Sequence, residues 1–183
     1  MAIDTTATPA SQGFRMPAEW EPHQATWLAW PHERTDWPGK FAPIPWIYGD
    51  IVRHLSKVET VRILVRDVKA RREAERCCDK SGANMANVEL VEAATDRSWT
   101  RDYCPIFAKR GQGESGILDF RFNGWAKYPN WRNDDAVPAL VAKMLRMKRW
   151  QPKSGGKRVV LEGGSIDVNG TGLLLTTEEC LLS

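Results

Sequence analysis

The chain has 183 residues, 42% of them hydrophobic and 27% charged, and no stretch approaches the roughly 20 consecutive apolar residues of a transmembrane helix. Its 26 Lys and Arg against 23 Asp and Glu give a formal charge of +3, too small and too evenly spread to indicate a nucleic-acid partner. Residues 1–12 lack the basic start and apolar core of a secretory signal, and their Thr, Ala and Ser content predicts a disordered tail. We expect residues 13–183 to lie in a single domain of a cytoplasmic protein.

The first half of the chain predicts two helices and two strands. Apolar residues at helical spacing predict a helix over residues 44–58, although Gly49 weakens the pattern. The residues expected on its buried face are Ile47, Ile51, Val52 and Leu55. The elements that follow are a β-branched strand over 61–67, a helix over 66–80 with Asp67 as its N-cap, and a strand over 88–94.

The second half repeats this alternation. Strands are predicted over 98–110 and 117–125 around the Gly-rich turn GQGES. A helix over 133–150 follows, in which Pro138 fits a first turn if Asp134 or Asp135 is the N-cap. The apolar face of that helix contains Val137, Leu140, Val141, Met144 and Leu145. The last segment, from Lys157 onward, contains two strands joined by the hairpin signal NGTG, and we expect an α/β repeat architecture.

Two carboxylates fall in these apolar segments. Asp102 precedes Tyr103 in a predicted strand, where its neighbour Arg101 would point to the opposite face and could not pair with it. Glu162 lies in VVLEGGS, beside glycines that allow a ligand or a backbone to approach closely. A buried carboxylate needs a partner, and a planar guanidinium or amidinium offers paired N–H donors. Trp99 could stack on such a cation, although core packing is an equally good explanation for any single tryptophan.

Other candidate sites are weaker. KSGGK fails the spacing of a phosphate-binding loop, and His23, His32 and His54 do not have metal-ligand spacing. The four cysteines include no C-x-x-C motif, which is consistent with a reducing compartment. The basic run from Lys143 to Lys153 suits the solvent-exposed end of a helix better than an RNA-binding surface.

Several linked motifs resemble one family in order and spacing. They are GFRMPAEWEPHQATWLAWPHERTDWPG, TDRSWTRDYCPIF, FNGWAKYPNW and VVLEGGSIDVNGTGLLLTTEECLL. From about Gly13 to the last residue, they resemble the N-terminal half of the agmatine deiminase family, also called the Porphyromonas-type peptidyl-arginine deiminase family. The resemblance implies the pentein fold, an α/β-propeller of ββαβ repeats. About two repeats and the opening hairpin of a third would be present here.

The resemblance also implies a chemistry and a set of roles. In the family, a cysteine thiolate attacks the guanidinium carbon, ammonia leaves, and water releases an N-carbamoyl product without a metal or organic cofactor. The W-x-R-D aspartate falls on Asp102, the L-E-G-G glutamate on Glu162, and the tryptophan of the pocket on Trp99. The nucleophilic cysteine and the general acid/base histidine are expected beyond this chain, because none of its histidines, nor Cys104 or Cys180, matches them. Cys104 also replaces a glycine that is usual in the family.

Three hypotheses follow for function. The first is a hydrolase that converts agmatine and water to N-carbamoylputrescine and ammonia in putrescine biosynthesis, with this truncated chain expected to be inactive alone. The second changes the substrate to free arginine or a peptidyl arginine. The third is a non-catalytic module that binds guanidines or polyamines. In each case the expected partner is a small guanidino compound, with no nucleic acid and no membrane, and a homo-oligomer is compatible with all of them.

Overall fold

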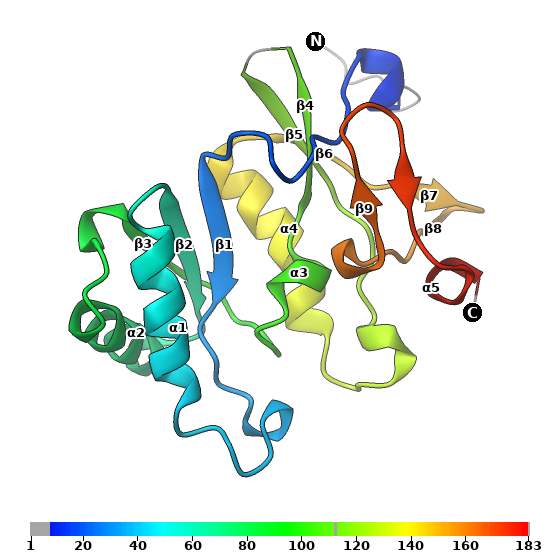
Figure 1. The fold of residues 1–183 in the computed structure, drawn as a ribbon. Helices are drawn as coiled ribbons and strands as arrows, with labels where there is room; N and C mark the ends of the chain where they lie inside the picture. The colour runs from blue at the N-terminus through cyan, green and yellow to red at the C-terminus, as the bar shows by residue number, and fades with distance from the viewer. Residues whose placement is uncertain (1–7, 112, 183) are drawn as a thin grey trace. The chain divides into compact units, whose positions relative to one another are not determined.

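The computed structural model describes residues 8–111 and 113–182, and these form an α/β fold in two compact units (Figure 1). The first unit comprises the described residues of 1–21, 101–123 and 136–183, and the second comprises 22–100 and 124–135. Residues 1–7 of the predicted disordered tail lie outside the described residues, and the prediction is wrong for Ala10–Gln12, which form the 3-10 turn η1. None of the described helices is long and apolar enough to cross a membrane.

The second unit is built on a parallel three-stranded sheet in the order β1-β2-β3. Its strands are β1 (Ala25–Ala29), β2 (Thr60–Val65) and β3 (Val88–Glu92), and its helices are α1 (Ile44–Leu55) and α2 (Val68–Lys80). The predicted strands over 61–67 and 88–94 correspond to β2 and β3. The sequence analysis did not predict β1, whose ATWLA run is only five residues long.

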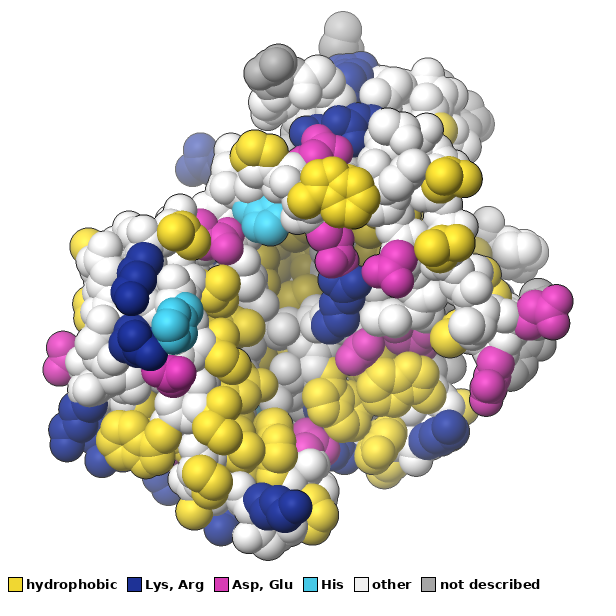
Figure 2. Space-filling view, viewed as in Figure 1, with side chains coloured by type: hydrophobic (Ala, Val, Ile, Leu, Met, Phe, Trp, Pro, Cys, Tyr) yellow, Lys and Arg dark blue, Asp and Glu magenta, His cyan; other side chains and the backbone are white. Residues whose placement is uncertain are grey.

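Helix α1 exists where it was predicted, but only part of its predicted face is buried: Val52 is fully buried and Leu55 packs against the core, whereas Ile47 and Ile51 are exposed. Ile47 is 49% exposed and Ile51 is 40% exposed, and Figure 2 shows hydrophobic side chains on the surface along this helix. The face that is buried contains Pro45, Gly49 and Val52. A Cβ on Gly49 would lie 2.9 Å from the carbonyl oxygen of Cys77 on α2, so the glycine that weakened the prediction is the residue that lets the two helices approach closely.

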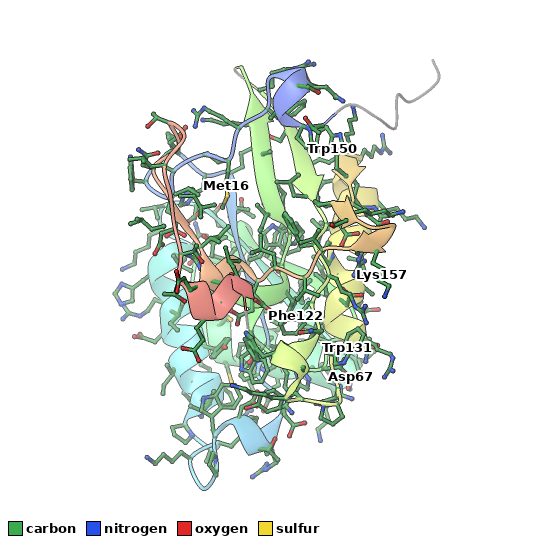
Figure 3. The ribbon with its side chains drawn as sticks, turned by 90° about the vertical axis from the view of Figure 1, so that its right-hand side faces the viewer. Met16, Asp67, Phe122, Trp131, Trp150 and Lys157 are labelled. Carbon is green, nitrogen blue, oxygen red and sulfur yellow. The ribbon has the colours of Figure 1, made fainter. Side chains whose placement is uncertain are left out.

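Helix α2 begins as the sequence predicts. The backbone N–H of Ala70 donates to the Asp67 carboxylate over 2.7 Å, and Asp67 is labelled in Figure 3. Its buried residues pack with those of α1 and of β2 into one core. The core residues are Trp30, Val52, Val61, Ile63, Val65, Ala70, Ala74, Cys77 and Cys78.

The first unit holds a mixed sheet in the order β4-β5-β6, formed by β4 (Ile106–Arg110), β5 (Glu114–Leu118) and β6 (Lys148–Trp150). Strand β5 pairs antiparallel with β4 and parallel with β6. The prediction of one strand over 98–110 is wrong for its first part, because residues Thr100–Tyr103 form the single helical turn α3. Gly111 and Gly113 of GQGES lie between β4 and β5, Glu114 and Ser115 begin β5, and residue 112 is outside the described residues.

Helix α4 (Arg132–Leu145) differs from the helix predicted over 133–150 in its N-cap and in its C-terminal end. Its first turn is capped by Asp96, which accepts the backbone N–H of Asn133 over 2.9 Å, instead of by Asp134 or Asp135. Pro138 consequently lies inside the helix and not in its first turn. At the other end, the chain leaves the helix at a left-handed residue, Arg146, and the basic residues after it belong to β6.

The C-terminal segment consists of short elements. These are β7 (Lys153–Ser154), β8 (Lys157–Arg158), the 3-10 turn η5 (Gly163–Ser165), β9 (Asp167–Val168), β10 (Leu174–Leu175) and α5 (Glu178–Leu182). Strands β9 and β10 pair antiparallel around NGTG, which confirms the predicted hairpin. The ββαβ order of β4, β5, α4 and β6 differs from the all-parallel sheet of the second unit, and the propeller repeat stays a prediction.

Candidate functional site

Two glycines bring Asp102 and Glu162 together in the first unit. Glu162 directly precedes η5, and Asp102 lies on α3. A Cβ on Gly163 would lie 2.5 Å from the carbonyl oxygen of Arg101, and a Cβ on Gly164 would lie 2.2 Å from Oδ1 of Asp102. No larger residue fits at either position unless the backbone or a side chain moves. The Gly-Gly pair therefore presses the Glu162 segment against the turn that carries Asp102.

The two carboxylates are partly or fully buried without a cationic partner. Glu162 is only 6% exposed, and burial raises the pKa of its carboxyl group. Burial, followed by the nearby charge of Glu162, raises the pKa of Asp102 to about 6. Over the described parts of the chain, no side chain donates a hydrogen bond to either carboxylate. Two like charges held in this way favour a cation from outside the chain.

Arg101 does not supply that cation. Its side chain forms ion pairs with Glu19 and, over 3.7 Å, with Asp167. Arg101 and Asp102 form no ion pair with each other, as expected, but the reason given for it was wrong. The two residues lie on a helical turn and not on a strand, and successive residues of a helix point about 100° apart.

A very small cavity lies beside Asp102. It is lined by Asp102, Tyr103, Cys104, Ile106, Leu118, Phe120, Phe122, Pro138 and Leu161. Its volume of about 10 Å³ is room for no more than one water molecule, so a guanidinium could not enter it. The rings of Tyr103 and Phe122 lie 6.0 Å apart behind the turn, and Phe122 is labelled in Figure 3. This packing gives α3 an apolar support.

Trp99 belongs to the second unit, where it joins an aromatic cluster. Its ring centroid lies 5.0 Å from those of Trp125 and Tyr128. The guanidinium carbon of Arg97 lies 4.9 Å from the Trp99 ring and 4.8 Å from the Tyr128 ring. One cation of the chain itself thus stacks on Trp99. The role of Trp99 in ligand binding stays a prediction from the family resemblance.

The sequence analysis did not find the network around Arg97. Arg97 and Asp36 form an ion pair in which both side chains are less than a tenth exposed. Nη2 of Arg97 also donates to Asn130 over 2.9 Å, and Asp134 accepts the backbone N–H groups of Asp96 and Arg97. Burial raises the pKa of Asp134 to about 7. A search for pairs of opposite charge would not have found these contacts, because Asp36 and Arg97 are far apart in the sequence.

The comparisons with known proteins agree on one family. The sequence profile described as Porphyromonas-type peptidyl-arginine deiminase matches residues 15–183. The chain belongs to this family. It is 36% identical to an agmatine deiminase of Ectopseudomonas mendocina, with 97% of this chain and 47% of that protein covered. An agmatine deiminase of Pseudomonas aeruginosa strain LESB58 is 34% identical with the same coverage.

Solved structures support the fold. The chain superposes on an agmatine deiminase of Enterococcus faecalis with a TM-score of 0.82 at 28% identity, covering 97% of this chain and 47% of that one. For the agmatine deiminase of C. jejuni the TM-score is 0.72 at 27% identity, covering 92% of this chain and 47% of that one. The expected fold relationship to the agmatine deiminases is confirmed. The chain spans about half the length of the curated relatives that it matches.

Proposed function

We propose that this chain supplies the guanidinium-binding carboxylates of an agmatine deiminase-like hydrolase. The observation that carries the proposal is the Asp102 and Glu162 pair, buried together without a cation from the chain. The proposal is also supported by similar proteins of Ectopseudomonas mendocina and Pseudomonas aeruginosa, which are named agmatine deiminases.

The chemistry of the pair suits a planar cation. Carboxylates accept the paired N–H groups of a guanidinium bidentately, and water exclusion strengthens that attraction. Bound carboxylates also stabilise positive charge on the guanidinium, which keeps its carbon electrophilic toward a nucleophile. In the proposed overall reaction, agmatine and water give N-carbamoylputrescine and ammonia: the bond from carbon to one terminal nitrogen breaks, and a water oxygen takes its place.

Calorimetric titration of the full chain with agmatine tests this proposal. We expect binding that weakens by at least about tenfold in Asp102→Asn and in Glu162→Gln, because each change removes one charge-assisted pair. Asp79→Asn, on the exposed side of α2, and Glu178→Gln, on α5, are matched controls that should bind as the wild type does. Unchanged agmatine binding in both site variants would contradict the proposal.

Two further ligands separate the alternatives. Putrescine has the amine of agmatine without its guanidinium group, so equally tight putrescine binding would also count against a guanidinium site. If free arginine binds more tightly than agmatine, the substrate assignment changes while the site assignment stands. Ammonia release is not expected in these samples, because the family's nucleophilic cysteine and general acid/base histidine are expected beyond this chain.

A further inference from the structure

A polar cleft lies at the carboxyl ends of the parallel sheet in the second unit. Glu33 follows β1, Arg66 follows β2 directly, and the stretch 94–96 follows β3. Asn130 and Asn133 complete the lining. The cleft has a volume of about 270 Å³, just below the roughly 300 Å³ at which pockets for drug-sized ligands begin, so it suits a smaller molecule. Loops at the carboxyl ends of parallel strands are where α/β sheets commonly bind ligands.

The two carboxylates of the cleft, Glu33 and Asp96, each accept a backbone N–H group of a nearby residue. Oε1 of Glu33 accepts the backbone N–H and the hydroxyl of Thr35 over 3.1 and 2.8 Å. Asp96 accepts the backbone N–H and the side-chain amide of Asn133 over 2.9 and 2.8 Å. The hydrogen bonds from Thr35 lower the pKa of Glu33, so that carboxylate stays ionised. Each carboxylate can still accept a hydrogen bond from a ligand, because an ionised carboxylate has about four lone-pair sites.

The donors of the cleft are largely uncommitted. Arg66 is half exposed, and its Nε lies 3.6 Å from Asp67. Apart from this ion pair, its guanidinium donates no hydrogen bond to any residue in 8–111 or 113–182. Asn130 accepts from Arg97 through Oδ1, which orients its amide and leaves the NH₂ group without a partner in the same two ranges. A guanidinium fork and an amide NH₂ together suit a ligand carboxylate.

We propose that this cleft binds a small zwitterion of the amino-acid class. Its carboxylate would pair with Arg66 and Asn130, and its ammonium group would pair with Glu33 and Asp96. A ligand with only one kind of charge would face groups of its own sign without compensation. No residue of this cleft belongs to the Asp102 and Glu162 pair, so the inference is independent of the proposed function.

An NMR titration of the full chain with L-alanine and two fragments of it tests the proposal. L-alanine carries both charges, propionate carries only the carboxylate, and ethylammonium carries only the amine. We expect L-alanine to shift the backbone amides of 94–96 and the side-chain amides of Asn130 and Asn133, with at least fivefold tighter binding than either half molecule. Propionate or ethylammonium binding as tightly as L-alanine would overturn the zwitterion assignment, and so would an absence of shifts at these amides.

Matched variants locate the binding. Arg66→Gln should weaken L-alanine binding at least fivefold, whereas Arg72→Gln, on the exposed side of α2, should leave it unchanged. Both variants should bind agmatine as the wild type does. If Arg66→Gln binds L-alanine like Arg72→Gln does, Arg66 is not the carboxylate partner and the proposal fails.

Discussion

Two buried acidic regions of the first unit differ in their partners. Asp119 is 1% exposed at its side chain and accepts from Arg149 and Gln151 over 3.0 and 2.8 Å, with Arg158 at 3.4 Å. Asp102 and Glu162 have no such donors and instead lie beside each other. Two uncompensated and at least partly buried charges do not stabilise a fold, which is consistent with the proposal that the second region binds a cationic ligand.

Removing one charge from each region gives the largest contrast. We expect Asp119→Asn to lower the free energy of unfolding by about 2 kcal/mol, because it removes the buried anion that accepts from Arg149, Gln151 and Arg158. Asp102→Asn should leave stability at pH 7 unchanged or raise it, since it removes repulsion from Glu162. Denaturant unfolding measures both, with exposed Asp167→Asn as the control. A loss of stability in Asp102→Asn as large as in Asp119→Asn would show that both regions are structural.

Substituting Gly164 by alanine tests whether stability and agmatine binding depend on the close contact between η5 and Asp102. The Cβ of Gly164→Ala would lie 2.2 Å from Oδ1 of Asp102, so we expect a loss of about 2 kcal/mol in stability and weaker agmatine binding. Gly155→Ala has nothing within 4 Å and should cost only about 1 kcal/mol, from its left-handed backbone, with binding unchanged. Equal effects of the two substitutions would contradict the close packing of η5 on α3.

The pH dependence of agmatine binding should follow Asp102. Its pKa is raised to about 6, and a cation binds the ionised carboxylate, so affinity should fall about tenfold from pH 7 to pH 5. Asp102→Asn should remove most of that dependence. The sign for stability is opposite: the folded chain binds a proton between the ordinary pKa of 3.8 and about 6, so stability without ligand should rise as the pH falls through that range. Agmatine affinities that are equal at pH 7 and pH 5 by calorimetry would contradict the assignment of this pH dependence to Asp102.

Local signals in the sequence predicted several elements correctly. The Asp67 cap, the β-branched strand β2 and the NGTG hairpin each depend on neighbouring residues, so their structures are those expected. The predictions were wrong where a contact with a segment distant in the sequence determines the local structure. Gly49 was taken as a weakness of α1 because its contact, the backbone of Cys77, is on another helix. The cap of α4 is Asp96 and not Asp134 or Asp135, and it was missed because Asp96 is far from the helix in the sequence.

The sequence by itself determined the family, the α/β class and the choice of Asp102 and Glu162 as candidate ligand-binding residues. Linked motifs and local periodicity depend only on residues that are close in the sequence. Only the tertiary structure decided that Gly163 and Gly164 press the two carboxylates together, that α3 is a helical turn, and that loops after three strands enclose a polar cleft. Burial and pairing of charges depend on which segments meet in space, and no spacing along the chain specifies that.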